Sequence, residues 1–342
     1  MLEKPEIKDE EIIACLRDEY GLNVNTISFL PLGADLNTAV YHTLTSDNTS
    51  YFVKLRRGEF NRASITVPNF LSNIDLQQII SSLPTQAGRL WSIIRSFAVI
   101  LYPFVEGKDG FASKLSKHQW IEFGTALKQF HVTKFPSDIT RGIKWDNFSP
   151  QWRNTVKKFL ERLETETLNN PTSRKLAGFL KVKENDIHEL VTRTDRFAKL
   201  LQEQSLEYIL CHGDIHGWNL LIAPNGKLHI IDWDTLIFAP KERDLMFIGA
   251  GLGDSGYTPQ EEEIMFYEGY GYTNINHIAL TYYRLERIIE DVAEYCEYIF
   301  SSIESEEDRK QSLKYLQSNF QPNGTVERAY QSIMQHKDYE KH

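Results

Sequence analysis

The segment from His212 to Asn219 constrains the fold of this chain more than any other stretch of its sequence. It reads His-Gly-Asp-Ile-His-Gly-Trp-Asn, and only four residues separate Asp214 from Asn219. A loop this short can turn a carboxylate and an amide toward the same point. The pattern therefore predicts a loop that presents two oxygen-bearing side chains together.

A β-hairpin is expected directly after this loop. The apolar residues Leu220–Ile222 read as a buried strand, Pro-Asn-Gly at 224–226 reads as a turn, and 227–231 read as a second short strand. The second strand ends at Asp232. The hairpin would therefore carry the Asp232 carboxylate back beside Asn219.

These three side chains match what phosphoryl transfer from ATP requires, which is one carboxylate for the attacking hydroxyl and oxygen ligands for metal ions. Asp214 would orient the acceptor hydroxyl and take its proton. Asn219 and Asp232 would bind Mg²⁺, a hard cation that prefers oxygen. We expect Asp244 to accept backbone N–H bonds from the loop, because buried loops need partners. His212 is interpreted as a residue that supports the loop and not as a catalyst.

Other interpretations of the loop remain open from the residues alone. The alternation of His212, Asp214 and His216 also suits the ligand trio of a zinc hydrolase. The chain has only ten His and no second cluster, which argues against that hypothesis. A structural turn without chemistry is a further alternative. Asp234 is interpreted as a turn or cap residue and not as a third metal ligand.

The order His-x-Asp-x-x-x-x-Asn, then Ile-Asp, then Asp-Leu resembles the aminoglycoside phosphotransferase family, a branch of the eukaryotic-like kinase fold. Within that family, the stretch 210–248 is most similar to the bacterial spectinomycin phosphotransferases. Further stretches resemble the same group: Gly33–Thr38, Tyr51–Leu55, Tyr102–Val105 and Phe266–Tyr270. Residues 137–205 and about the last forty contribute little to the resemblance.

The resemblance implies an α+β, bilobal protein-kinase-like fold. A small N-terminal lobe with an antiparallel sheet would span 1–104, and a larger, mostly helical lobe would span 105–342, with a helical insertion at about 137–205. Alternation and turn signals predict strands at Thr26–Leu32, Ala39–Thr45, Ser50–Leu55, Trp91–Arg95 and Ala98–Tyr102. Helical spacing predicts helices at 9–20, 116–131 and 277–300, and a helical hairpin within 153–204.

Lys54 lies in a strand of alternating character, where it is either a solvated lysine or a phosphate ligand. By the resemblance it would pair with the α- and β-phosphates of ATP. Kinase-like folds orient this lysine with a glutamate on the next helix. Here only Glu59 follows closely, Arg62 stands where an acid is expected, and Pro68 is expected to interrupt the helix.

Two backbone segments would hold the rest of the nucleotide. The loop containing Gly33, Asp35 and Asn37 could lay N–H groups over the phosphates, or it could be an ordinary hairpin connection. By the resemblance, adenine would bond to the Pro103 carbonyl and to the Val105 backbone. A proline can accept such a bond, since only its donor is missing. The same segment also suits a simple linker between lobes.

The predicted helix 277–300 carries a row of carboxylates: Glu286, Glu290, Glu294 and Glu297. The row could bind the protonated amines of an aminoglycoside-like molecule, although an acid-rich face is more often simply solvated. Trp218 could offer an apolar wall to a sugar-like ring, and it could equally be structural.

Composition limits the partners. The formal net charge of −9 argues against binding to nucleic acid and is compatible with a small cationic substrate. The three cysteines suggest reduced thiols and a cytoplasmic location. The longest apolar run, Phe97–Val105, is too short to span a membrane. We expect a monomer.

The expected activity is the ATP- and Mg²⁺-dependent phosphorylation of a hydroxyl on a small cation, with spectinomycin indicated by the resemblance. A kinase of another metabolite, such as choline, methylthioribose or a homoserine-like compound, would share every catalytic residue. A protein kinase is disfavoured because the His-Arg-Asp, Asp-Phe-Gly and Ala-Pro-Glu signatures are missing from the sequence. A nucleotide-binding protein without catalysis is the alternative from another class.

Overall fold

A computed structural model describes residues 4–32, 37–58, 60–165, 170–249, 256–300, 306–322 and 324–334. The chain divides into two compact units. The first comprises residues 1–144, 214–236 and 265–271, and the second comprises 145–213, 237–264 and 272–342. The lobe boundary predicted between residues 104 and 105 lies inside the first unit, and it stays a prediction.

The first unit contains the predicted five-stranded antiparallel sheet, with the strand order β1-β2-β3-β5-β4. Its strands are β1 Val24–Leu30, β2 Thr38–Thr45, β3 Ser50–Arg57, β4 Ser92–Ile94 and β5 Phe97–Pro103. Each predicted strand is present, with ends that differ by a few residues. β3 is the central strand and is hydrogen-bonded on both sides, to β2 and to β5.

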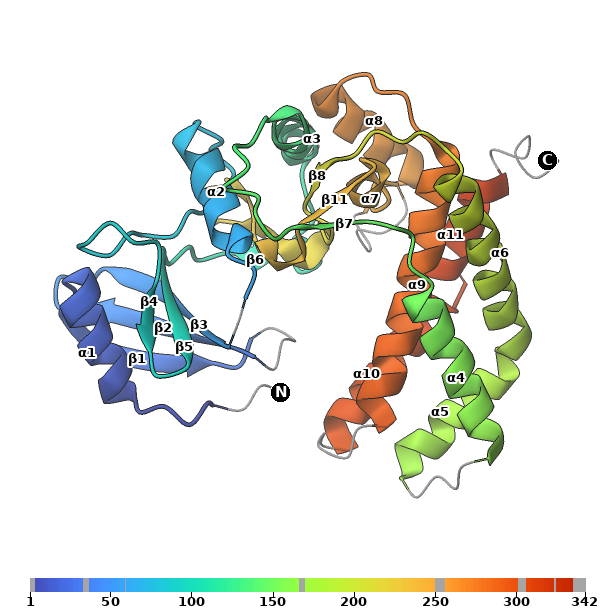
Figure 1. The fold of residues 1–342 in the computed structure, drawn as a ribbon, viewed down its shortest axis with the longest axis horizontal. Coiled ribbons are helices and arrows are strands. Elements are labelled where there is room, and N and C mark those ends of the chain that lie inside the picture. Colours follow the sequence, from blue (N-terminus) through green and yellow to red (C-terminus); the bar gives the residue numbers. More distant parts are fainter. Residues whose placement is uncertain are drawn as a thin grey trace. The chain divides into compact units, whose positions relative to one another are not determined.

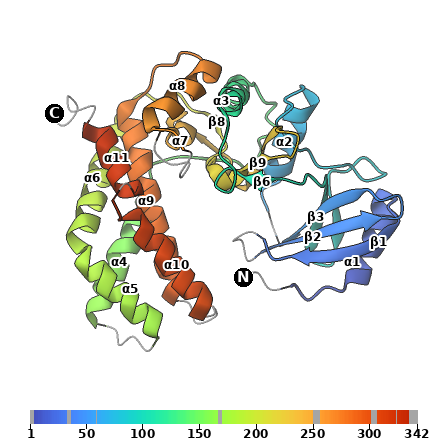
Figure 2. The ribbon, with the colours of Figure 1, turned by 180° about the vertical axis from the view of Figure 1, so that it is seen from behind.

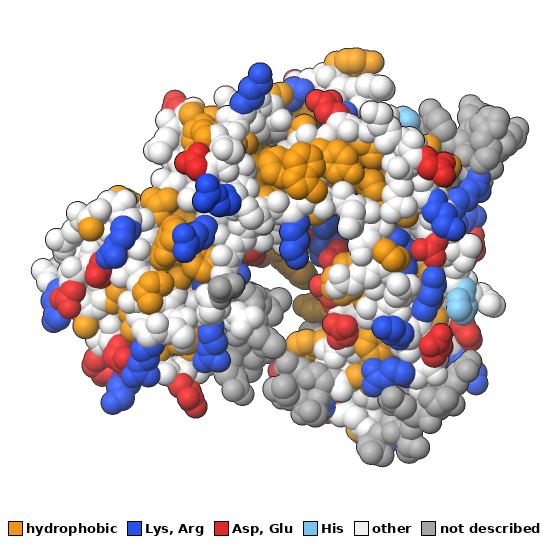
Figure 3. Space-filling view, in the orientation of Figure 1, with side chains coloured by type: hydrophobic (Ala, Val, Ile, Leu, Met, Phe, Trp, Pro, Cys, Tyr) orange, Lys and Arg blue, Asp and Glu red, His pale blue; other side chains and the backbone are white. Residues whose placement is uncertain are grey.

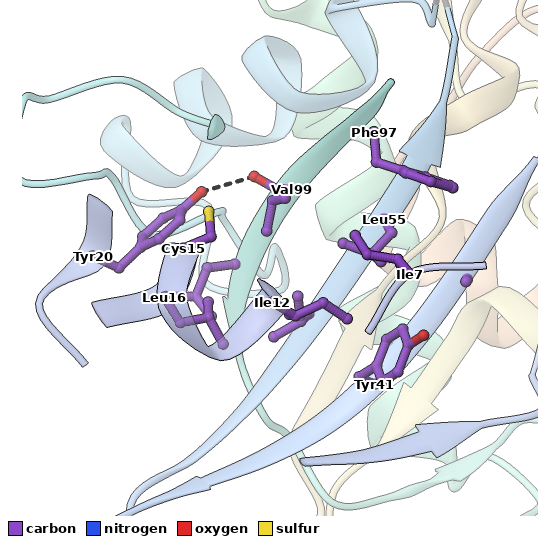
Figure 4. Packing of buried hydrophobic residues seen from close by; sticks show 12 residues of the cluster. Ile7, Ile12, Cys15, Leu16, Tyr20, Tyr41, Leu55, Phe97 and Val99 are labelled. Atoms are coloured by element: carbon purple, nitrogen blue, oxygen red, sulfur yellow. Dashed lines mark hydrogen bonds between the residues drawn. The ribbon is translucent and has the colours of Figure 1, made fainter. Parts of the chain in front are cut away.

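Helix α1 (Asp9–Tyr20) covers one face of this sheet (Figure 1). Its buried side chains pack into the cluster drawn in Figure 4, where the Tyr20 hydroxyl donates a 2.8 Å hydrogen bond to the Val99 carbonyl oxygen. Val53 and Leu55 of β3 point into the same cluster. Successive strand residues face opposite sides, so Lys54 must lie on the face that α1 leaves open.

Helix α2 (Ala63–Asn73) corrects one expectation, because it continues through Pro68. The proline removes a helical hydrogen bond and costs about 3 kcal/mol inside a helix. Ile65, Val67 and Leu71 of the same helix are almost completely buried. Each contributes about 1.5–3 kcal/mol when it leaves water, so packing outweighs the defect.

Helix α3 (Lys117–Val132) has the predicted apolar face, and Ser116 caps its N-terminus with a hydrogen bond from the Gln119 N–H. It crosses α8 (Pro259–Tyr270) at two glycines. A Cβ on Gly124 would lie 2.1 Å from the Phe266 carbonyl oxygen, and one on Gly269 would lie 1.9 Å from the Ile121 carbonyl oxygen. The two helices therefore meet at a distance that only glycine permits.

The predicted hairpin is also present in the first unit. Strands β9 (Leu220–Ile222) and β10 (Leu228–Ile230) pair antiparallel, and β6 (Lys108–Asp109) adds to the β9 edge. Two short 3-10 helices flank the hairpin, η1 (Gly217–Asn219) before it and η2 (Trp233–Thr235) after it.

The second unit is mainly helical. Helices α4, α5, α6, α10 and α11 pack against the long helix α9 (Figure 2). Their bounds are α4 Gln151–Thr165, α5 Pro171–Val182, α6 Glu184–Gln202, α9 His277–Phe300, α10 Glu306–Asn319 and α11 Thr325–Met334. The predicted hairpin within 153–204 is instead three helices. One side of α9 is a stripe of buried residues at helical spacing: Leu285, Ile289, Val292, Cys296 and Ile299.

A small sheet completes this part of the fold, with the order β7-β11-β8 and a short helix α7 after β11. The bounds are β7 Lys144–Trp145, β8 Ile209–Cys211, β11 Ile237–Ala239 and α7 Glu242–Leu245. Basic and acidic side chains are interspersed over the helical unit in Figure 3. Among the described helices, none combines the length and the apolar character that crossing a bilayer requires.

Candidate active site

Asp214 and Asn219 are joined by a hydrogen bond within the loop. The Asn219 Nδ2 donates to the Asp214 backbone carbonyl oxygen at 2.7 Å. The Asn219 N–H donates to the His216 carbonyl oxygen at 2.9 Å, which closes η1. Because the amide nitrogen is used for this bond, Oδ1 is the atom of the Asn219 side chain that can bind a cation.

The hairpin brings Asp232 next to this loop. Leu220 pairs with Ile230 in the β9–β10 register, and the Ile231 N–H donates to the Asn219 carbonyl oxygen at 3.0 Å. Asp232 follows immediately, with its carboxylate half exposed at 51%. Two hard oxygen donors, an amide oxygen and an accessible carboxylate, therefore come from neighbouring segments, which is a donor set that suits Mg²⁺.

The backbone of Asp232 is in the left-handed region, with φ 61° and ψ 73°. Side chains other than glycine rarely adopt this conformation, although aspartate and asparagine tolerate it better than most. The turn from β10 into η2 is tight at this residue. The strained backbone directs the chain into η2 immediately after the carboxylate.

Lys54 reaches this turn from β3. Its Nζ lies 2.7 Å from Asp234 Oδ2 and 3.7 Å from Asp232 Oδ1. Arg56, two residues further along the same face of β3, also forms an ion pair with Asp234. A continuous series of contacts therefore links Asp214, Asn219, the Asp232 turn and Lys54 within one unit.

The earlier interpretation of Asp234 as a turn or cap residue is too narrow, because Asp234 is the acid that both cations share. Burial alone would raise the pKa of its carboxyl, but the charges of Lys54 and Arg56 outweigh burial and lower the pKa to about 2. The carboxylate is therefore ionised at neutral pH. The sequence shows only that Lys54 and Arg56, two apart on a strand, share one face; it does not show which carboxylate they meet.

Asp244 supports the chain just before Asp214, as predicted. Its Oδ2 accepts the His212 N–H at 2.9 Å and its Oδ1 accepts the Gly213 N–H at 2.8 Å. Asp244 and His212 are fully buried. Gly213 has φ 86°, a backbone conformation that favours glycine. Both carboxylate oxygens are thus used to hold the backbone.

The predicted phosphate loop is only partly described. Gly33 and Asp35 lie outside the described residues, as does Glu59, the predicted partner of Lys54. Asn37 is exposed, and its carbonyl oxygen accepts the Arg57 N–H at 2.8 Å. This bond ties the end of the loop to β3.

The predicted adenine contacts lie where the sheet ends. Pro103 is the last residue of β5 and is exposed. Val105 lies in the segment that joins β5 to β6 and is half-buried. Pro103 pairs with Tyr51 in the β3–β5 register, so this segment leaves the sheet at the start of β3, three residues before Lys54.

The acidic row on α9 does not behave as one solvated face. Glu286 is buried and forms an ion pair with the buried guanidinium of Arg153. Burial raises the pKa of Glu286 to about 7, against the opposing effect of Arg153. Glu290 is half-buried and Glu294 is exposed. The solvated-face interpretation is therefore wrong for Glu286, because it was drawn from helical spacing without knowledge of Arg153.

Trp218 lies inside the loop, between Asp214 and Asn219, and its side chain is 52% exposed. The ring of Phe111, which is also exposed, packs against it edge-on with a centroid distance of 5.1 Å. The loop thus carries an exposed aromatic side chain between Asp214 and Asn219.

An antiparallel sheet with a lysine on its central strand, and a loop–hairpin that supplies Asp, Asn and Asp, define a kinase-like phosphotransferase. A family model described as the phosphotransferase enzyme family matches residues 28–274. The chain belongs to this family, the aminoglycoside phosphotransferases. The zinc-hydrolase hypothesis is therefore wrong.

Solved structures support the same assignment. A spectinomycin phosphotransferase in complex with ADP and spectinomycin is 34% identical, with a TM-score of 0.89 over 96% of this chain and 99% of that chain. An AMP-bound complex of spectinomycin phosphotransferase is 33% identical, with a TM-score of 0.85 over 95% and 98%. A choline kinase from Streptococcus pneumoniae shares the fold alone, at 17% identity and a TM-score of 0.54 over 91% and 99%.

Proposed function

We propose that this phosphotransferase uses ATP to phosphorylate a hydroxyl of an aminoglycoside-like antibiotic, with spectinomycin as the leading substrate. The observation that carries the proposal is the series of contacts that joins Asp214, Asn219, the Asp232 turn and Lys54. The likeness of the whole chain to a spectinomycin phosphotransferase supports the choice of substrate.

In the proposed reaction, the Asp214 carboxylate accepts the proton of the substrate hydroxyl. The hydroxyl oxygen forms a bond to the γ-phosphorus, the bond from that phosphorus to the bridging oxygen breaks, and ADP leaves. Most of the rate enhancement in such a reaction comes from alignment and charge neutralisation, and little from covalent chemistry. The short distance between Asp214 and Asn219 along the chain supports this alignment.

Lys54 is proposed to hold the polyphosphate, with Asp234, which Arg56 also contacts, fixing the direction of its Nζ. Asp234 thereby takes the orienting role that we first expected of a glutamate on the next helix. Mg²⁺ bound by Asn219 Oδ1 and the Asp232 carboxylate would neutralise charge on the phosphates. Gly33, Asp35 and Asn37 are proposed to add backbone contacts to the phosphates, and Pro103 and Val105 to hold adenine.

The substrate is proposed to be a cation with a ring. Trp218 offers an exposed aromatic face that suits the apolar side of a sugar-like ring. Glu290 and Glu294 are proposed to bind protonated amines, and Glu286 has less negative charge to offer because its pKa is raised toward neutrality. Reliance on ATP agrees with a cytoplasmic location, as do three cysteines that are all free and buried.

The decisive experiment measures ADP release and product mass with Mg²⁺, ATP and spectinomycin. The proposal requires substrate-dependent ADP release and a product heavier by one phosphoryl group. Choline, methylthioribose and homoserine serve as parallel substrates. Phosphorylation of one of these and not of spectinomycin would replace the proposed substrate, and ADP release with none of them would contradict the proposed acceptor class. Asp214→Asn is the control, because it keeps the size of the side chain and loses the base.

A further inference from the structure

We infer that His216 is a positioning residue for Asp214, which it holds through a hydrogen bond from its ring Nε2–H to the carboxylate. The inference rests on the proposed role of Asp214 and deepens it. His216 Nε2 lies 3.2 Å from Asp214 Oδ2. The sequence had offered His216 only as a possible zinc ligand.

The other ring nitrogen fixes the tautomer. His216 Nδ1 lies 3.2 Å from the backbone nitrogen of Trp218, whose N–H it accepts. A backbone N–H can only donate, so Nδ1 must carry a lone pair and no proton. A neutral imidazole then carries its hydrogen on Nε2, which makes Nε2 the donor to Asp214.

The surrounding packing locks the ring in this orientation. Its side chain is 12% exposed, and the rings of Trp218 and Phe111 lie at centroid distances of 5.5 and 6.4 Å. Gly217 makes this packing possible, since a Cβ there would lie 2.9 Å from Phe111 Cε2. The Gly110 N–H also donates to the Gly217 carbonyl oxygen at 2.8 Å.

The consequence for chemistry is that the carboxylate of Asp214 has a fixed rotation before substrate arrives. A carboxylate accepts a proton efficiently only when one of its oxygens is aimed at the hydroxyl. His216 holds one oxygen of the Asp214 carboxylate with a neutral N–H donor. The carboxylate is therefore oriented without a full positive charge beside it. Loss of this bond should lower the rate of the chemical step and leave binding of both substrates nearly unchanged.

Two substitutions separate the two ring nitrogens. In His216→Asn the amide oxygen can replace Nδ1 as acceptor for the Trp218 N–H, but the side chain is too short to reach Asp214. In His216→Gln the amide nitrogen can occupy the place of Nε2 and donate to Asp214. We expect His216→Asn to lower kcat about 10- to 100-fold with KM for ATP and acceptor changed less than about 3-fold. His216→Gln should recover most of kcat.

The exposed His188 of α6, changed to Asn, is the matched control and should leave kcat unchanged. Thermal denaturation of each variant checks that it is folded. Equal kcat in the Asn and Gln variants, a wild-type kcat in His216→Asn, or an effect confined to KM would overturn the inference.

A second measurement does not depend on activity. Nitrogen-15 NMR of the ring should show the Nε2–H tautomer of His216, and the Nε2 signal should move in Asp214→Ala. An Nδ1–H tautomer, or an Nε2 signal that Asp214→Ala leaves in place, would overturn the inference even in a wild-type protein that phosphorylates nothing. If the wild-type enzyme is inactive and the NMR result is as expected, the proposed function fails and the bond between the two residues stands.

Discussion

Lys54 on the central strand of the sheet forms a 2.7 Å hydrogen bond with Asp234, a residue 180 positions later in the chain. Asp234 lies two residues after Asp232, so one turn supplies both the proposed metal ligand and the acid that orients the phosphate lysine. Arg56 shares the same carboxylate. The position of Lys54 therefore depends on the turn after β10.

Asp234→Asn should lower kcat/KM for ATP about 10-fold or more, because Lys54 and Arg56 lose the charge that aligns them. It should also reduce the free energy of unfolding by about 2 kcal/mol at neutral pH, the amount expected for a carboxyl whose pKa falls from 3.8 to about 2.

The pH dependence of this effect has a fixed sign. A lowered carboxyl pKa stabilises the folded protein above about pH 4 and stops doing so as the pH falls through about 2. Chemical denaturation of wild type and Asp234→Asn across this range provides the measurement. A stability difference that stays constant down to pH 2 would show that the charge of Asp234 contributes nothing.

Much of the fold follows from local patterns in the sequence. The alternation of β3, the helical spacing of α3 and α9, and the turn at Pro-Asn-Gly are each set by residues close together in the chain. The hairpin that brings Asp232 beside Asn219 is local in the same sense. These features were predictable because the spacing of apolar residues and the residue types at turns decide them.

Pairings between distant residues were not predictable in this way. Nothing near Glu286 indicates that Arg153 neutralises it, and nothing near Asp234 indicates Lys54. The continuation of α2 through Pro68 likewise depends on tertiary burial that outweighs a local helix-breaking signal. The sequence therefore predicted the loop and its three oxygen-bearing residues, but not the ion pairs that surround them.

At position 232, a glycine variant should be more stable than an alanine variant. The φ of 61° at Asp232 penalises alanine by about 1 kcal/mol and leaves glycine unstrained. We expect the free energy of unfolding of Asp232→Gly to exceed that of Asp232→Ala by about 1 kcal/mol in denaturant titrations. Elsewhere in a protein, glycine normally destabilises relative to alanine. If the alanine variant were the more stable of the two, the left-handed backbone at this residue would be refuted.

Glu286→Gln tests the buried pair on α9. Folding raises the pKa of this carboxyl from 4.5 to about 7. Between these two pH values, Glu286 keeps its proton in the folded protein and loses it in the unfolded chain. The wild type should therefore lose stability relative to the variant as the pH rises from about 4.5 to about 7, by about 3 kcal/mol in total. Melting curves of both proteins at several pH values would reveal this trend, and parallel curves would disprove it.

Glu290→Gln tests the proposed amine contact. Loss of one charge-assisted contact, worth about 1 kcal/mol, should raise KM for spectinomycin about 5-fold and leave KM for ATP unchanged. Glu161 on α4, an exposed glutamate outside the acidic row, changed to Gln, serves as the matched control. Steady-state kinetics that do not distinguish the two variants would remove Glu290 from the substrate site.

Calorimetric titration of ATP with and without Mg²⁺ tests most directly whether Asp214, Asn219 and Asp232 converge on one magnesium–triphosphate group. We predict that Asp232→Ala loses the Mg²⁺-dependent part of the affinity, about 10-fold or more, while Asp214→Asn binds as tightly as wild type but transfers no phosphoryl group. Equal Mg²⁺-dependent affinity in wild type and Asp232→Ala would contradict this account of the site.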